Sequence, residues 1–400
     1  IMKHIKKRYI ILIGFVLILM IGFIILSVAN RPLSKDEMNI IIDEELTKMV
    51  NKNDEITSAL LTVYSDKLHL NMAFAAGNTG KDLAEPVTVN HPYYSASIGK
   101  TFTSTLVGML CEEGVISYDD LISRYLDDKL LEGLFVYEGV DYKDQVTIKQ
   151  LLGHMSGIGD YYEDPVSQGD TMLEILIKKP DKLWTPLELI SFTRENQKAI
   201  ARPGEVFHYS DTGYILLGFM IESATGQEFH EVLHKKIIDP LGMNDTYLMF
   251  KSKPNNPPKY DILEVYVDGF NLSKTNALSF DWSGGGLVTT MSDLLIFNKA
   301  LNNGKLVSFD TLKLMTDFNQ EYINGVHYGL GIMEFNFGEF SFLFKGIPNI
   351  YGGVGDSSTF MMYDKTNDIH IIGNFGSVDF MEKSVPFLAR VLMLVDCLKE

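Results

Sequence analysis

Strand-like segments lie at both ends of the 400-residue chain, and a long, mainly helical stretch separates them. Two apolar runs, 59–64 and 68–75, are joined by a short Ser-Asp-Lys turn and predict a β-hairpin. Three further strands are expected at 339–344, 358–363 and 369–374. This order favours one sheet built from both ends of the chain, with a helical subdomain inserted between them. A catalytic cleft is commonly found between two such halves.

The first thirty residues have the pattern of a membrane signal anchor. A basic cluster runs from Lys3 to Arg8, and residues 10–26 follow as an uncharged apolar run. The run is near the lower limit for a bilayer span, and the preceding basic flank predicts that the rest of the chain lies outside. Small residues at 27–29 resemble a signal-peptidase site, so a cleaved signal peptide is the alternative. We favour an uncleaved single-pass anchor in the cell membrane, with the remaining chain extracellular.

These patterns divide the chain in order. We expect a cytoplasmic basic flank at 1–8, a transmembrane anchor at 9–28, a linker at 29–34 and a folded domain at 35–398, with its helical subdomain roughly at 115–285.

Composition excludes several classes of function. Hydrophobic residues make up 46% and charged residues 22% of the chain, which is typical of a globular protein with a large core. The net charge of −17 argues against a nucleic-acid partner. The two cysteines, Cys111 and Cys397, lack metal-ligand spacing, and free thiols are favoured over a disulfide. Because there is also no Gly-rich phosphate loop, the sequence predicts neither a metal nor another cofactor.

Ser97 and Lys100 stand three residues apart at the expected start of a helix. Apolar residues at helical spacing follow, and Gly114 is a plausible end. In that position the lysine can take the proton of the serine hydroxyl, and the N–H groups of the helix start can help to hold an oxyanion. The motif alone is weak, because Ser-x-x-Lys is common by chance and a serine at a helix start is usually a cap.

Four later segments resemble those of the serine β-lactamase-related hydrolases, and they occur in the order found in that family. They are LLGHMSGI (151–158), PGEVFHYSDTGYILLG (203–218), PLGMNDT (240–246) and GGGLVTTMSDL (284–294). The family includes class C β-lactamases, penicillin-binding D-alanyl-D-alanine carboxypeptidases, D-aminopeptidases and esterases. The resemblance implies an α+β fold of the β-lactamase/transpeptidase type, in which helices flank both faces of an antiparallel sheet and a helical subdomain is inserted.

The resemblance also implies roles for particular residues. Ser97 is then the nucleophile, Lys100 its neighbouring base and Tyr209 the tyrosine of the second family motif. A tyrosine beside an ammonium is expected to have a lowered pKa, and an enclosed lysine to lose its proton more easily. Asp211 replaces the asparagine that the family often has and is a candidate for substrate binding, although it lacks the amide donor to substrate. It keeps an acceptor for Lys100, and its charge favours a higher lysine pKa. His154 is expected to be structural, outside the site.

The third family motif, Lys-Thr-Gly or His-x-Gly on a strand beside the site, lacks its cation in this chain. Two alignments are open, at 350–352 and at 353–355, which makes Tyr351, Gly352, Gly353 and Gly355 candidates for substrate binding. The strand backbone is expected to complete the oxyanion hole. The missing side chain is the one that would meet a substrate carboxylate, so anionic substrates are expected to be disfavoured.

The sequence therefore predicts an exported, membrane-anchored serine hydrolase that cleaves an ester or amide through an acyl-enzyme on Ser97. Its substrate is a small molecule or a peptidoglycan-type peptide or ester, and peptidase, β-lactamase and esterase activity are not separated. The alternative is a weak or inactive penicillin-binding-like module that binds cell-wall peptide or a partner protein. The lost third motif and Asp211 favour that alternative, whereas the presence of Ser97, Lys100 and Tyr209 favours the enzyme.

Overall fold

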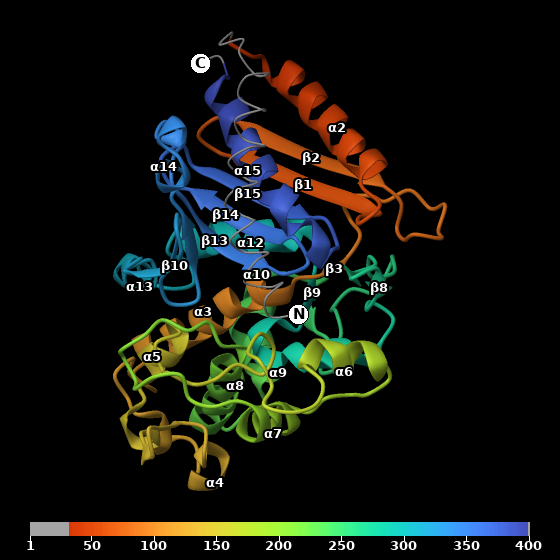
Figure 1. Ribbon diagram of the computed structural model, residues 1–400. Coiled ribbons are helices and arrows are strands. Elements are labelled where there is room, and N and C mark those ends of the chain that lie inside the picture. Colours follow the sequence, from red (N-terminus) through yellow and green to blue (C-terminus); the bar gives the residue numbers. More distant parts are fainter. Residues whose placement is uncertain (1–31, 399–400) are drawn as a thin grey trace.

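The computed structural model describes residues 32–398. An eight-stranded sheet with helices on both faces forms one half of the molecule, and a mainly helical region forms the other (Figure 1). The predicted basic flank and membrane anchor lie outside the described residues. Within residues 32–398, no helix is both long enough and apolar enough to cross a membrane.

The large sheet combines the two ends of the chain, as predicted. Its order is β10-β11-β12-β13-β14-β15-β1-β2, and each neighbouring pair is antiparallel. The register of β1 against β15 pairs Leu60 with Asn374 and Val63 with Ile371. The α+β fold class expected from the sequence is therefore confirmed. The strands are β1 (Ser58–Ser65), β2 (Leu70–Gly77), β10 (Gln320–Ile323), β11 (Val326–Tyr328), β12 (Met333–Phe335), β13 (Ile350–Gly355), β14 (Thr359–Asp364) and β15 (Ile369–Asn374).

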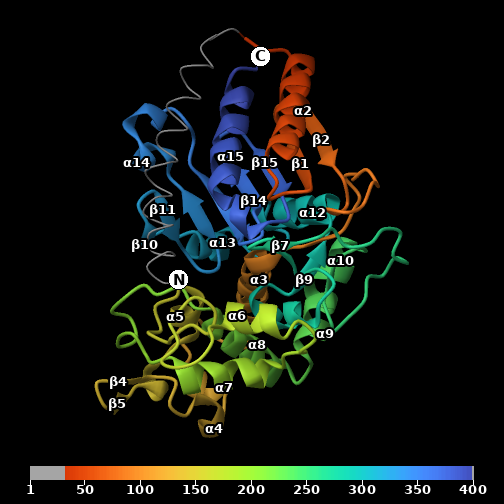
Figure 2. The same cartoon turned by 45° about the vertical axis from the view of Figure 1, so that its right-hand side comes forward.

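Helices α2 (Lys35–Lys52) and α15 (Met381–Asp396) lie together on one face of this sheet (Figure 2). The first of them begins at a capping box between Ser34 and Glu37, and it buries Met38 and two further residues at helical spacing. Alternate residues of β1, such as Leu61, face this layer. Leu60 instead joins the core on the opposite face, where α12 (Met291–Asn302) packs on β14 and β15.

One predicted strand is wrong. Residues 339–344 are not extended: they belong to α14 (Phe337–Phe340) and the 3₁₀ turn η6 (Phe342–Phe344). The rings of Phe335, Phe337 and Phe340 pack together with centroids 6.1–6.3 Å apart, and the three-residue spacing of the last two suits a helical turn. A short apolar run by itself does not distinguish a strand from a helical turn.

The remaining helices and strands include those that form the helical half. The helices are α3 (Gly99–Glu112), α4 (Asp128–Leu131), α5 (Ile148–Leu152), α6 (Met172–Lys178), α7 (Pro186–Asn196), α8 (Asp211–Thr225), α9 (Phe229–Leu233), α10 (Asp239–Leu241), α11 (Trp282–Gly285) and α13 (Phe309–Met315). Short strands are β3 (Tyr93–Tyr94), β4 (Val136–Tyr137), β5 (Val140–Asp141), β6 (Tyr247–Leu248), β7 (Tyr266–Val267), β8 (Phe270–Asn271) and β9 (Leu287–Thr289). Short segments of other helix types are η1 (Ala96–Ile98), η2 (Ile122–Arg124), η3 (Lys143–Gln145), η4 (His234–Ile238), η5 (Asn276–Asp281) and η7 (Val378–Phe380).

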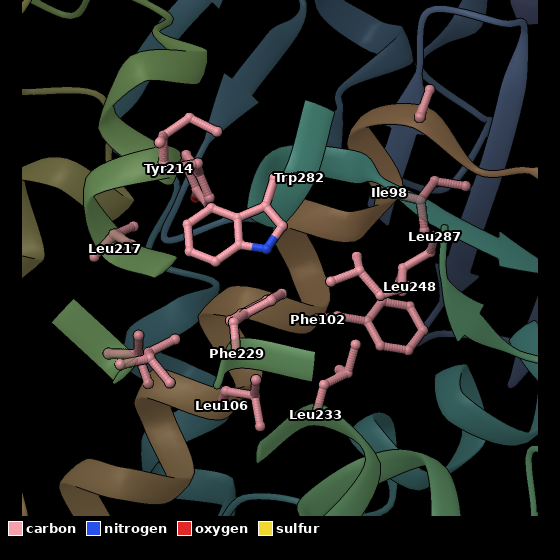
Figure 3. Packing of buried hydrophobic residues seen from close by; sticks show 14 of the residues in the cluster. Ile98, Phe102, Leu106, Tyr214, Leu217, Phe229, Leu233, Leu248, Trp282 and Leu287 are labelled. Atoms are coloured by element: carbon pink, nitrogen blue, oxygen red, sulfur yellow. The ribbon is translucent and has the colours of Figure 1, made fainter. Parts of the chain in front are cut away.

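Helix α3 runs through the core between the two halves, and nearly all of its residues are buried. Phe102 stacks on Phe297 of α12 with ring centroids 3.7 Å apart, and Figure 3 shows Phe102 among the buried side chains around α3. The buried hydroxyls of α3 are also paired: Thr101 donates to the carbonyl of Gly331 at 2.8 Å, and Thr103 to that of Ser283 at 2.6 Å. The first turns of α3, which follow the Ser97 turn, are thus hydrogen-bonded to segments of both halves.

Candidate active site

Ser97 lies in η1, which continues directly into α3, as its spacing from Lys100 predicts. Ala96, the residue before it, has a left-handed φ of 48°, a strained conformation for a residue with a side chain. The Ser97 side chain is half-buried, whereas Lys100 is 1% exposed. The Lys100 Nζ donates a hydrogen bond to the Ser97 Oγ at 3.0 Å. The structure therefore brings the two residues of the motif into direct contact.

The ammonium of Lys100 is held by an ion pair with Asp211 and donates to the carbonyl of Gly284 at 3.3 Å. Asp211 is the first residue of α8, whose N-terminus Ser210 caps. Burial alone would lower the pKa of Lys100, but the charges of Asp211 and Asp281 outweigh it and raise this pKa. The expectation of an easily lost lysine proton is therefore wrong, whereas the raised lysine pKa expected from the charge of Asp211 agrees with the structure.

Tyr209 completes the group around Ser97. Its ring centroid lies 5.0 Å from the Lys100 Nζ, and its hydroxyl is hydrogen-bonded to Ser97. Burial and the charge of Asp211 raise the pKa of Tyr209 well above its usual value, and the hydrogen bond to Ser97 offsets this only in part. The lowered tyrosine pKa expected from the sequence is therefore wrong, because burial and the aspartate outweigh the neighbouring ammonium.

His154 supports the segment that carries Tyr209. Its Nδ1 accepts a hydrogen bond from the backbone N–H of Ser210 at 3.0 Å, and its ring packs on that of Tyr209 with centroids 4.3 Å apart. Burial and the charge of Lys100 hold the pKa of His154 well below its usual value, so the imidazole is neutral. His154 is therefore a buried supporting residue, although its ring contacts Tyr209 directly, whereas we expected it from the sequence to lie outside the site.

Strand β13 passes closely beside the Ser97 turn at its C-terminal end. A Cβ placed on Gly355 would lie 3.2 Å from the backbone nitrogen of Ser97, and one on Gly353 would lie 3.2 Å from the Cα of Ile98. Only glycine permits this approach, and an oxyanion hole made from the two segments requires it. The structure thus favours the 353–355 alignment of the third motif.

The other two candidates on β13 are not brought to Ser97. The Tyr351 hydroxyl donates to Asn302 at 2.8 Å, and its ring contacts Phe318 and Tyr363. A Cβ on Gly352 would strike the backbone of the neighbouring strand β14 at Met361. Both residues therefore have roles in sheet packing, for which the sequence pattern alone gave no indication.

Four carboxyl groups near Ser97 were missed by reasoning from the sequence: Asp160, Glu163, Asp281 and Asp356. For each of them burial raises the pKa, and the charge of Asp211 raises it further. Asp356 directly follows the 353–355 alignment of the third motif, which was the one available signal for it. Within residues 32–398, no group of three or more His, Cys, Asp or Glu side chains is placed to hold a metal ion. Cys111 and Cys397 are free thiols.

The fold and the arrangement around Ser97 are those of a serine hydrolase of the β-lactamase/transpeptidase type. The family described as Beta-lactamase matches residues 43–375, and the chain belongs to this family. Its members are serine hydrolases.

Known relatives agree with this assignment. Penicillin-binding protein 4* of Bacillus subtilis (strain 168) is 29% identical over 237 residues, which cover 56% of this chain and 48% of that protein. A putative D-alanyl-D-alanine carboxypeptidase of Salmonella agona (strain SL483) is 27% identical over 320 residues, covering 72% of this chain and 71% of that one. The match spans only about half the length of several of these relatives.

Solved structures show the same fold. The D-amino acid amidase of Ochrobactrum anthropi SV3, complexed with D-phenylalanine, superposes with a TM-score of 0.73 at 22% identity, covering 90% of this chain and 99% of that chain.

Proposed function

We propose that this protein hydrolyses an ester or amide through an acyl-enzyme on Ser97. The observation that carries the proposal is the hydrogen bond from the Lys100 Nζ to the Ser97 Oγ. The Tyr209 hydroxyl is hydrogen-bonded to the same serine side chain. Covalent catalysis needs a nucleophile in contact with a proton acceptor, and a third group that orients this acceptor.

The proposed reaction uses the neutral form of Lys100. Its amine takes the proton of Ser97 as the Ser97 Oγ bonds to the substrate carbonyl carbon. The N–H groups of Ser97 and of the end of β13 stabilise the oxyanion. Lys100, with Tyr209, then returns the proton to the leaving group as its bond to the carbonyl carbon breaks. Water then gives a proton to Lys100 and attacks the acyl carbon. The bond from this carbon to the Ser97 Oγ breaks, which releases the acid and restores Ser97.

Non-catalytic binding is the second candidate. It is favoured by the raised pKa of both Lys100 and Tyr209, because neither group is then a ready base at neutral pH. Covalent labelling of Ser97 separates the two candidates.

The missing cation on β13 leads to a prediction about substrate class. Penicillins, cephalosporins and D-alanyl-D-alanine peptides carry a carboxylate near the scissile bond, and here it would meet Asp356 rather than a lysine. The loss of a charge-assisted hydrogen bond costs about 1.5–3 kcal/mol, or roughly ten- to a hundredfold in kcat/KM. We expect a short-chain nitrophenyl ester to exceed both nitrocefin and a D-alanyl-D-alanine tripeptide in kcat/KM by at least about tenfold. A tenfold advantage for either anion would show that another group binds the carboxylate.

The location of the protein is proposed from sequence alone. We propose that residues 9–28 anchor the chain in the cell membrane and that the hydrolase domain faces the outside. Protease added to intact cells should then digest the domain. Digestion only after lysis would contradict the proposal.

A further inference from the structure

The segment 208–211, which carries two of the residues around Lys100, is hydrogen-bonded to the loop that follows α5. The N–H of His208 donates to the carbonyl of His154 at 2.8 Å, and the hydroxyl of Ser210 donates to that of Gly159 at 3.1 Å. Because the backbone N–H groups at a helix start have no partner within the helix, outside acceptors decide how such a segment lies. The loop is therefore the support of this segment.

Asp160 joins this loop to the start of α8. The residue is completely buried, and its Oδ1 accepts the N–H of Asp211 at 2.7 Å and that of Thr212 at 3.4 Å. Its Oδ2 accepts the N–H groups of Tyr162 at 3.2 Å and of Glu163 at 2.6 Å. One carboxyl group thus binds N–H groups of two segments that lie about fifty residues apart in the sequence.

Asp160 is itself held in place. Its N–H donates to the Oδ2 of Asp164 at 2.6 Å, and the same oxygen lies 3.0 Å from the Nε2 of His208. Burial and the charge of Asp211 raise the pKa of Asp160, whereas the N–H groups of Glu163 and Asp211 lower it because they bind the ionised form. Both its oxygens and its N–H are therefore committed to hydrogen bonds.

We propose that Asp160 is a positioning residue for the reaction: it binds the N–H of Asp211 and so holds the Asp211 carboxylate against the Lys100 ammonium. The inference rests on the proposed function and adds a residue that the proposed reaction does not use. The charges of Asp211, Asp281 and Tyr328 are those that act most on Lys100, so Asp160 acts on this lysine through Asp211. A displacement of about 1 Å in such a pair can change a rate about a hundredfold.

The pH dependence of kcat/KM for a neutral nitrophenyl ester tests this inference, because a weaker ion pair lowers the pKa of Lys100. In Asp160→Asn the amide keeps one acceptor oxygen but turns an NH₂ group toward backbone donors. The rise of kcat/KM with pH should then occur at least about 0.5 pH unit lower, within the 1–3 units of a lost charge interaction. Asp160→Ala has no acceptor and should shift the rise further.

A double variant separates an effect through Asp211 from a direct effect of the Asp160 charge. Adding Asp160→Asn to Asp211→Asn should move the rise by no more than about 0.3 pH unit, whereas independent effects would add. Asp293→Asn is the matched control. Asp293 is 4% exposed and accepts the N–H of Asp245 at 3.0 Å and the hydroxyl of Thr246 at 2.8 Å. Its replacement should lower the melting temperature and leave the rise in place.

Two results would overturn the inference: a rise that stays at the wild-type pH in the Asp160 variants, and shifts that add in full in the double variant. Asp160→Asn decides alone if Asp160→Ala does not fold. If the wild-type protein turns over no substrate, the proposed function fails, and crystal structures of the wild-type and Asp160→Asn proteins test the positioning by itself. The distance from the Lys100 Nζ to the Asp211 carboxylate should increase by at least about 0.5 Å, the tolerance of a working site. An unchanged distance would reject the inference.

Discussion

Replacing Ser97 by alanine is expected to abolish ester hydrolysis and covalent labelling by a fluorophosphonate, with the fold intact. Ser97 supplies the one oxygen to which both Lys100 and Tyr209 are hydrogen-bonded. Removal of a nucleophile typically costs about 10⁴-fold or more in kcat. Because the side chain is half-buried and outside the apolar core, its loss creates no large cavity. Intact-mass spectrometry measures the labelling, and thermal unfolding checks the fold.

The partners of Ser97 supply the companion variants. Lys100→Ala and Tyr209→Phe should each lower kcat by about 10²–10⁴-fold, the range for positioned acid–base groups. Lys305→Ala, at an exposed position, is the matched control for the loss of a lysine. Labelling that persists in the Ser97→Ala protein would remove this serine from the mechanism. A wild-type protein that binds but is never acylated would favour the non-catalytic candidate.

The sheet was predictable because its pattern is local and repeated. Strand β1 is buried along nearly all of its eight positions, and β2 alternates buried with more exposed residues over its eight. Strands β14 and β15 are also mostly buried, and a short turn joins them. Their pairing across the chain followed from the order of elements. The prediction at 339–344 failed because Phe340 suits a strand or a helical turn equally well, and its packing against Phe335 and Phe337 decides for the turn.

Only those residues of the candidate site that lie in recognisable sequence motifs were predictable. Ser97, Lys100 and Tyr209 lie in conspicuous segments, and the structure brings them together. Glu163, Asp281 and Asp356 are ordinary acidic residues in the sequence, and their proximity depends on how three distant segments pack. The pKa of Lys100 depends on a balance between burial and several charges, which sequence spacing does not give.

Asp211→Asn should shift the pH dependence of catalysis to lower pH. In the wild-type protein the charges of Asp211 and Asp281 raise the pKa of Lys100, so the ammonium persists at neutral pH. The amine must be neutral to take the proton of Ser97, so kcat/KM rises as pH rises through the pKa of Lys100. Asparagine keeps an acceptor for Lys100 but removes a neighbouring charge, and burial then lowers the lysine pKa. An opposite charge at this range shifts a pKa by about 1–3 units.

The measurement is kcat/KM for a neutral nitrophenyl ester across the pH range in which the protein stays folded. Because the pKa of Lys100 is raised above its ordinary value, wild-type kcat/KM should still be rising at the alkaline end of this range. In the Asp211→Asn protein the rise should occur about 1–3 pH units lower, the size of the lost charge interaction. Asp144→Asn changes the net charge equally and should leave the rise in place. A rise that stays at the wild-type pH would mean that Asp211 does not control the protonation of Lys100. A lower maximum of kcat/KM with no change in pH would show that Asp211 orients the lysine without setting its charge. A downward shift would show that the charge of the aspartate, in place of the usual asparagine, sets the pH above which Lys100 acts as a base.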